Sequence, residues 1–139
     1  MRSHFALRYG PILSVAVILI HMTPARPMAE TLRFECHWSE RFDTSTNETY
    51  PASGSVSFII DLSPDGPSRM RRMGLDQPFS VHVTAESYKG RTEHRIEDFQ
   101  VQEFVVIDRL TGEIEAWTMM GEAGGSLTGR CNEVVRAPE

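Results

Sequence analysis

Three of the five histidines and two neighbouring glutamates have side chains suited to catalysis or metal binding. His37, His82 and His94 have the ring nitrogens that a catalytic triad or a zinc site uses. They lie far apart, however, and belong to no G-x-S-x-G, H-x-H or H-E-x-x-H pattern. Glu113 and Glu115 could pair as the two acids of a glycosidase, and the simpler interpretation makes them outward positions of a strand. We therefore expect no enzyme, no metal site and no cofactor.

A group of three arginines is the main candidate for a binding site. Arg69, Arg71 and Arg72 lie among methionines in a segment with proline and glycine at its borders, and a loop is predicted over residues 68–78. Guanidinium groups bind phosphate, sulfate and carboxylate groups, and methionines adapt to a partner's surface. The alternative is a solvated loop whose methionines cover one end of the fold.

The N-terminal segment has the order of a secretory signal peptide: arginines, an apolar run and then small residues. Arg2 and Arg8 precede the apolar run 11–20, which is shorter than the about 20 residues that span a bilayer. Cleavage is expected after Ala25 or Ala29, and the alternative is an uncleaved membrane anchor. We predict a signal peptide over residues 1–29, one domain over residues 30–139, and a periplasmic or secreted location.

The charge of the expected mature chain excludes some classes of partner. The whole chain has 14 basic and 19 acidic residues. Cleavage after Ala29 removes three arginines and no acid, so that 11 basic residues remain against 19 acidic ones, a formal charge of −8. An acidic protein is a poor general ligand for nucleic acid or for an anionic membrane. We expect neither as a partner, and instead expect a protein or small ligand of the cell envelope.

The two cysteines lie near the two ends of the expected domain. In an exported chain an even pair indicates a disulfide, and no C-x-x-C spacing supports the alternative of a redox or metal pair. A bond between Cys36 and Cys131 closes nearly the whole domain. The chain-entropy treatment gives such a cross-link roughly 4–5 kcal/mol of stabilisation.

Short alternations of apolar and polar residues indicate β-strands throughout the domain, and no useful 3.6-residue repeat is present. The predicted fold is all-β, a small antiparallel barrel or sandwich made of a meander of about six to eight strands and closed by the disulfide. Strands are expected at residues 32–38, 56–62, 79–85, 96–108, 114–118 and 127–135, with loops at 39–54 and 68–78 and turns at 89–91 and 121–126.

The inward positions of these strands form the predicted core, in which large aliphatic and aromatic side chains predominate. The core is expected to contain Leu32, Phe34, Trp38, Val56, Phe58, Ile60, Phe79, Val81, Val83, Val106, Ile114 and Leu127.

The segment Asp108-Arg-Leu-Thr-Gly112 lies between two apolar runs and is predicted to be a structural hairpin turn. Asp108 can accept hydrogen bonds from nearby backbone N–H groups, and Thr111 can form a local bond with its hydroxyl. Gly112 can take the positive φ that a type I turn followed by a bulge requires. Arg109 is expected to lie in solvent or against an acidic neighbour.

Two parts of the chain resemble a group of small exported bacterial β-proteins of uncharacterised function. Ile107-Asp-Arg-Leu-Thr-Gly112 matches an I-[DN]-R-x-T-G hairpin, and after a glycine-rich turn Gly129-Arg-Cys131 matches a terminal G-x-C. Phe34-Glu-Cys36 matches the aromatic-x-Cys strand with which such proteins tend to start. The resemblance implies a bacterial exported β-domain and supplies no activity.

These observations favour an exported, non-enzymatic binding or interaction protein that acts through surface loops on a rigid scaffold. One version is an inhibitor of a cell-envelope hydrolase, because small periplasmic lysozyme inhibitors are likewise acidic, disulfide-linked β-barrels, a likeness of class only. The alternative is a small-ligand carrier with a lipocalin-like cavity. That cavity would be lined by Phe58, Phe79, Phe104 and Trp117.

Overall fold

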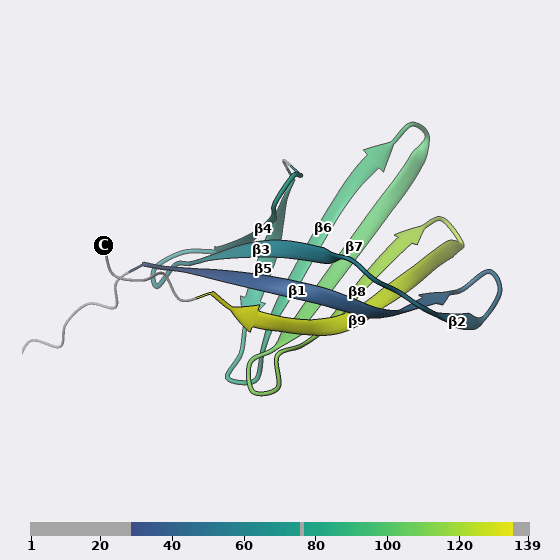
Figure 1. Ribbon diagram of the computed structural model, residues 1–139. Helices are drawn as coiled ribbons and strands as arrows, with labels where there is room; N and C mark the ends of the chain where they lie inside the picture. The colour runs from purple at the N-terminus through teal and green to yellow at the C-terminus, as the bar shows by residue number, and fades with distance from the viewer. Residues whose placement is uncertain (1–28, 76, 135–139) are drawn as a thin grey trace, which may run out of the picture.

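The computed structural model describes residues 29–75 and 77–134, which form nine strands and contain no helix (Figure 1). No helix in these ranges is long and apolar enough to cross a membrane. The predicted signal peptide lies, except for Ala29, outside the described residues. The strands are β1 (Glu30–Asp43), β2 (Glu48–Pro51), β3 (Ser55–Leu62), β4 (Ser68–Arg72), β5 (Pro78–Val83), β6 (Ser87–Ile96), β7 (Phe99–Asp108), β8 (Glu113–Met120) and β9 (Ala123–Glu133).

The strands close into an antiparallel barrel, which confirms the predicted fold class. β1 and β3 to β9 pair with their neighbours in sequence order, and pairing of β1 with β9 completes the circle. The short strand β2 is an addition that pairs with the second half of β1, next to β3 on the same side. Closure leaves few free sheet edges, which an open sheet of this length would expose.

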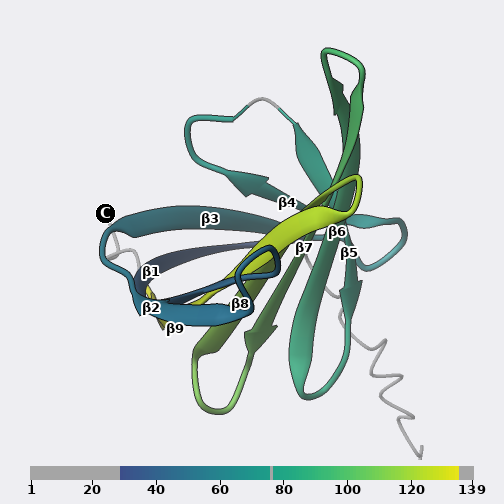
Figure 2. The same cartoon turned by 90° about the vertical axis from the view of Figure 1, so that its right-hand side faces the viewer.

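The barrel has two ends that differ in construction (Figures 1 and 2). The hairpin end carries the β3–β4, β5–β6 and β7–β8 connections, and it lies near the described N- and C-terminal ends of the fold. The open end carries the β1–β2, β4–β5, β6–β7 and β8–β9 connections. The β6–β7 hairpin extends beyond the strands next to it (Figure 2), so the barrel wall is uneven at the open end.

Alternating side chains fill the barrel from the hairpin end to its middle, as period-two strands require. Phe58, Ile60 and Met70 are completely buried, and Phe79 is nearly so. Cross-strand register places Leu32, Ile60, Met70 and Phe79 in one row across four strands. The buried cluster contains Leu32, Phe34, Cys36, Phe58, Ile60, Met70, Phe79, Tyr88, Val105, Ile107, Ile114 and Cys131.

Most of the predicted core is confirmed, and the prediction was wrong for two residues, Val106 and Val83, which are exposed. Trp38, Val56 and Val81 pack against the buried cluster without being fully buried, and Leu127 is half-buried. Val106 faces outward, because the inward positions of β7 are Val101, Glu103, Val105 and Ile107. Residues 105–107 are all apolar, so the sequence does not show which of them face inward. Val83 is exposed because it ends β5, where the barrel interior meets solvent at the hairpin end.

The predicted loops at residues 39–54 and 68–78 are only partly irregular. The first contains the second half of β1 and all of β2, and the second contains β4. In β4 the fully buried Met70 is flanked by Arg69 and Arg71, which face the other side. The outward side chains of β4 are charged and only Met70 is apolar and fully buried, so the sequence alternation that indicates a strand was not recognised.

The turn predicted at residues 89–91 was wrong, since these residues lie in the middle of β6. The true connection is residues 84–86, where Thr84 accepts hydrogen bonds from the backbone N–H groups of Glu86 and Ser87. Close packing, rather than a turn, explains the glycine at position 90. A Cβ there would lie 3.1 Å from Met70 Sδ and 3.3 Å from Phe79 Cβ. The turn predicted at 121–126 is also shorter, because β9 begins at Ala123.

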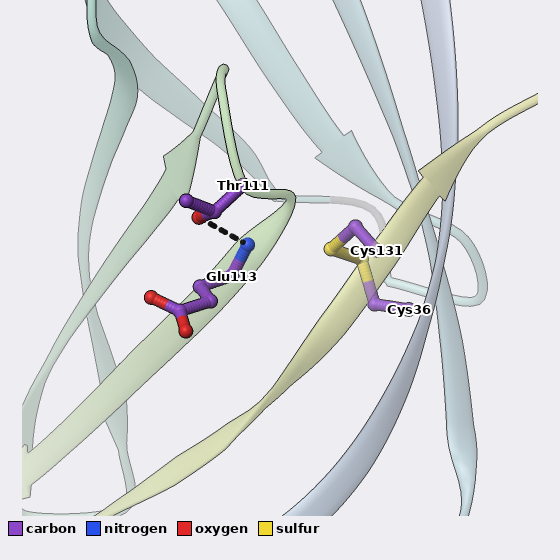
Figure 3. Close-up of a disulfide and its surroundings, with 4 residues drawn as sticks. All are labelled: Cys36, Thr111, Glu113 and Cys131. Atoms are coloured by element: carbon purple, nitrogen blue, oxygen red, sulfur yellow. Dashed lines mark hydrogen bonds between the residues drawn. A yellow bond between two sulfur atoms is a disulfide. The ribbon is translucent and has the colours of Figure 1, made fainter.

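The disulfide between Cys36 and Cys131 is confirmed (Figure 3). The two residues are directly opposite each other on β1 and β9, and both are buried in the core. Their Cα atoms are 3.9 Å apart, closer than the about 4.4–6.8 Å that is usual. Opposed pairs that do not exchange backbone hydrogen bonds are the closest in antiparallel sheets. Cys131 N–H instead donates to Gly112 O at 2.7 Å.

The Asp108–Gly112 turn is a structural hairpin, as predicted. Asp108 Oδ1 accepts hydrogen bonds from the backbone N–H groups of Leu110 and Thr111, both at 2.8 Å. Gly112 has φ of 75°, and Thr111 Oγ1 accepts a hydrogen bond from Glu113 N–H at 3.2 Å (Figure 3). These bonds define the β7–β8 connection without any external ligand.

Arg109 is a structural member of the same turn, contrary to the expectation that it lies in solvent or against an acid. Its Nη1 donates to Thr84 O at 2.7 Å, and its guanidinium lies 5.0 Å from the centre of the Tyr88 ring. Its backbone N–H donates to Glu86 O at 2.8 Å. Arg109 therefore joins the β7–β8 hairpin to the β5–β6 turn at the hairpin end.

Candidate functional site

The barrel interior is not filled at the open end, where a cavity of about 250 Å³ remains. Residues of β1, β7, β8 and β9 form most of its wall, and Arg72 enters it from β4. Its lining includes Trp38, Arg41, Phe42, Asp43, Arg72, Glu103, Phe104, Val105, Ala116, Trp117, Thr118 and Leu127.

An ion pair lies at the base of this cavity. Glu103 occupies an inward position of β7 whose neighbours on the same face, Val101 and Val105, are apolar and buried. Arg72 Nη2 donates to Glu103 Oε1 at 3.0 Å, and the two side chains are 26% and 11% exposed. A pair so shielded from water needs good geometry to offset the desolvation of both charges.

His94 lies next to Glu103 on the inner face, although it does not line the cavity. Its Nδ1 lies 3.9 Å from Glu103 Oε2, is buried, and has no hydrogen-bond partner in the part of the chain that the structure describes. Cross-strand register places His94 opposite Val101, on the same inner face as Glu103. The base of the cavity thus combines a guanidinium and a carboxylate, and an imidazole lies behind the carboxylate, outside the cavity lining.

A β-bulge directs a second arginine into the cavity. The register of β1 against β9 shifts between Trp38 and Glu40, and an inserted residue reverses which side chains face inward. After the bulge Arg41 is opposite Leu127, which pairs with the inward Ala116 of β8. The Arg41 side chain is exposed at the cavity edge, and its guanidinium lies 5.5 Å from the centre of the Tyr50 ring on β2. It forms no ion pair with any residue in the described ranges.

Asp43, at the end of β1, has its hydrogen-bonding capacity occupied by the following turn. Its Oδ1 accepts hydrogen bonds from Ser45 Oγ at 2.6 Å and from Ser45 N–H at 2.8 Å. These bonds favour the ionised form and hold the pKa of the Asp43 carboxyl below its ordinary value of 3.8. Asp43 is therefore a structural acceptor at the cavity edge.

Five exposed apolar side chains lie at the open end. They belong to three segments of the backbone that Figure 2 shows: the β4–β5 connection, the β6–β7 hairpin and the end of β8. Phe99, at 55% exposure, pairs across the hairpin with Ile96 at 52%. We call these residues the apolar rim: Met73, Leu75, Ile96, Phe99 and Met120.

The three arginines predicted as one binding cluster are divided between the two faces of β4. Arg72 faces the cavity, whereas Arg71 is on the outer face with its Nε 3.6 Å from Asp61 Oδ2. Arg69 is opposite Asp61 in the β3–β4 register and is exposed. The structure therefore brings only Arg72 of the three into the open-end cavity.

The other candidate residues do not gather into a site. His37 and His82 are exposed on β1 and β5, far from His94 in the fold. The described residues contain no group of three or more histidine, cysteine, aspartate or glutamate side chains placed to hold a metal ion. Of the aromatic residues suggested to line a carrier cavity, Phe58 and Phe79 are buried in the core. Phe104 and Trp117 border the open-end cavity, from outward positions of β7 and β8.

A larger hollow on the outer face of β1, β7, β8 and β9 measures about 700 Å³ and contains both candidate glutamates. Glu113 Oε1 lies 3.9 Å from Arg130 Nη2, and these side chains are 67% and 69% exposed. Glu115 accepts a hydrogen bond from Trp117 Nε1. Charges so exposed are well solvated and have little energetic consequence, unlike the shielded Arg72–Glu103 pair of the open-end cavity.

Sequence reasoning weighed His94 only as a catalytic or metal-binding candidate, and it missed Arg41 and Glu103 as members of a site. Glu103 could have been found, because it interrupts the apolar alternation of Val101, Val105 and Ile107. Arg41 could not, because its inward orientation depends on the bulge. No family model, curated protein or solved structure matched this chain in comparisons with known proteins.

Proposed function

We propose that this protein is an exported, non-enzymatic binding protein whose binding site is the open end of the barrel. The observation that carries the proposal is the cavity itself: Arg41, Arg72 and Glu103 face the interior at one end of a barrel that is otherwise packed with apolar side chains. Arg72 and Glu103 are shielded from water, and shielded charges usually weaken a fold compared with apolar side chains of similar size. Their position beside an unfilled space favours a role in binding.

Export is supported by the disulfide. A bond between Cys36 and Cys131 persists in an oxidising compartment, such as the periplasm or the extracellular medium. The predicted signal peptide and the resemblance to small exported bacterial β-proteins agree with that location.

A protein of the cell envelope is the partner that the apolar rim favours. Exposed apolar patches mark interaction surfaces, and the rim places five exposed apolar side chains on the connections and strand ends of the open end. The negative charge of the mature chain favours a basic partner. An inhibitor of a basic cell-wall hydrolase is the specific version of this proposal.

The partner proposal can be tested with a rim variant and a matched control. Ile96→Ser/Phe99→Ser removes two rim side chains, and Val106→Ser removes an exposed apolar side chain from the outer face. Purified exported protein and both variants would be titrated against a panel of lysozymes and other cell-wall hydrolases. We expect inhibition by the protein and by Val106→Ser, with loss in the rim variant. Equal activity of every hydrolase in their presence and absence would reject the inhibitor version.

A small-ligand carrier is the second candidate, and the cavity supports it. Its volume of about 250 Å³ is below the about 300–1,000 Å³ of pockets for drug-sized molecules. A large lipocalin-like ligand is disfavoured, because Phe58 and Phe79 occupy the middle of the barrel. Native mass spectrometry of the exported protein should then detect a small bound molecule that is lost from an Arg41→Gln variant.

A further inference from the structure

We infer that the open-end cavity is a carboxylate-binding site in which Arg41 and Arg72 bind the anion. This inference rests on the proposed function, because it names the chemistry of the group that the open end accepts. It follows from a comparison of hydrogen-bond donors and acceptors around the cavity.

Each carboxylate that lines the cavity already has a partner within the protein. Glu103 Oε1 accepts from Arg72 at 3.0 Å. Asp43 Oδ1 accepts two hydrogen bonds from Ser45.

The donors, in contrast, are in excess. A guanidinium has five N–H donors in a planar fork. Arg72 uses one of them, on Glu103, and Arg41 only faces the ring of Tyr50. Among the described residues neither arginine has a further side-chain hydrogen bond, so most of their donors are available to a ligand. Guanidinium donors bind carboxylates in a bidentate, planar arrangement.

Inward apolar side chains define the rest of the ligand. Trp38, Val105, Ala116 and Leu127 line the cavity on the same inner face as Arg41. The edge-to-face pair of Phe42 and Trp117 lies on the outer face of the same wall, where Trp117 Nε1 donates to Glu115. The site therefore fits a small carboxylate with a flat, apolar body, of which benzoate is the simplest probe.

The test is a calorimetric titration of the exported protein with sodium benzoate at constant ionic strength. Benzyl alcohol, which has the same ring without the charge, is the neutral comparison. We expect benzoate to bind at least about tenfold more tightly than benzyl alcohol. Equal affinity of the two compounds, or no binding of any carboxylate offered, would overturn the inference.

Variants assign the binding to the two arginines. Arg41→Gln should weaken benzoate binding by about tenfold or more. The control Arg33→Gln changes an arginine on the outer face of the same strand, where its partner is Glu35 at 3.5 Å, and should bind as the unchanged protein does. Equal affinity in Arg41→Gln and Arg33→Gln would exclude Arg41 from the site.

Arg72 needs a second design, because its removal leaves the shielded Glu103 unpaired. Arg72→Gln/Glu103→Gln replaces both charges by neutral amides of similar shape. Circular dichroism would establish that this double variant is folded. We expect loss of benzoate binding in the folded double variant, and retained affinity would exclude Arg72.

The carboxylate could belong to a free molecule or to the C-terminus of a partner protein. A short peptide ending in phenylalanine, compared with its C-terminal amide, distinguishes the sources. Binding of benzoate identifies a free ligand as sufficient, and binding of the peptide acid alone identifies a protein terminus. The Ile96→Ser/Phe99→Ser variant retains both arginines, so failure of the partner proposal and failure of carboxylate binding are separate results.

Discussion

The hairpin end and the open end of this barrel are built from the same strands and satisfy opposite requirements. At the hairpin end, Asp108, Thr111 and Arg109 all bond within the protein, and the disulfide lies in the adjoining core. At the open end, charged side chains face an unfilled cavity and apolar side chains face solvent. Leu110 and Val83 are exposed at the hairpin end as well. From the remaining contrast we expect substitutions at the hairpin end to change stability more, and substitutions at the open end to change binding more.

The largest effect should follow from removal of the disulfide. Cys36→Ala/Cys131→Ala opens a loop of sequence separation 95, which the chain-entropy treatment equates with about 4–5 kcal/mol. Urea unfolding followed by fluorescence would measure the loss. Reduction of the unchanged protein should lower stability by a similar amount. A double variant as stable as the parent would contradict a stabilising role for this bond.

Core truncation should have the next largest effect and should separate the two ends. Phe58→Ala removes a fully buried ring and should lower the free energy of unfolding by about 3–5 kcal/mol. Phe99→Ala at the apolar rim removes a ring that is 55% exposed, and should change stability by less than about 0.5 kcal/mol. Equal losses in the two variants would show that the rim is part of the core.

The hairpin end was largely predictable from sequence, because its determinants are local. The positions of Asp108, Thr111 and Gly112 in the chain are sufficient to define a turn. Cys36 and Cys131 were paired because they are the two cysteines of an expected exported domain. The alternation of Leu32, Phe34 and Cys36 likewise sets the inner face of β1 by itself.

The open end was not predictable, because its determinants are tertiary. Arg41 faces inward only because a bulge shifts β1 against β9, a strand about 85 residues away in the chain. The sequence places Arg72 beside Arg69 and Arg71, and only the strand conformation of β4 turns neighbouring side chains to opposite faces. The pairing of Arg72 with Glu103 depends on barrel closure, which no local pattern encodes.

A glycine at each end provides a third comparison. Gly112 has φ of 75° and a Cβ there would lie 2.6 Å from Cys131 O, whereas Gly121 has φ of 64° and open space around it. Gly112→Val should lower stability by more than about 1 kcal/mol, because backbone strain and steric overlap act together. Gly121→Val should be less harmful, since strain acts alone. A reversed order in thermal unfolding would contradict this account.

Arginines also differ between the ends. Arg109→Ala removes the hydrogen bond to Thr84 O and the contact with the Tyr88 ring, and should lower stability by about 1 kcal/mol. Arg41→Ala removes a side chain without an ion pair among the described residues, and should change stability by less than about 0.5 kcal/mol. Chemical unfolding would measure both. An Arg41→Ala loss larger than that of Arg109→Ala would assign a structural role to the open end.

The smallest effect concerns one turn carboxylate at each end. Hydrogen bonds from the backbone of Thr111 and Leu110 lower the pKa of Asp108 below its ordinary 3.8, and bonds from the Ser45 hydroxyl and backbone lower that of Asp43. A lowered folded-state pKa adds stability above the unfolded pKa, and this stability is lost as the pH falls through the folded value.

Asp108→Asn and Asp43→Asn should each reduce stability near neutral pH and flatten its decline in acid. Urea midpoints from about pH 7 to about pH 2 would test this. Because Asp108 determines the turn whose Gly112 O accepts the Cys131 N–H, we expect its substitution to have the larger effect, and a parallel acid profile in Asp108→Asn and the parent would contradict its role.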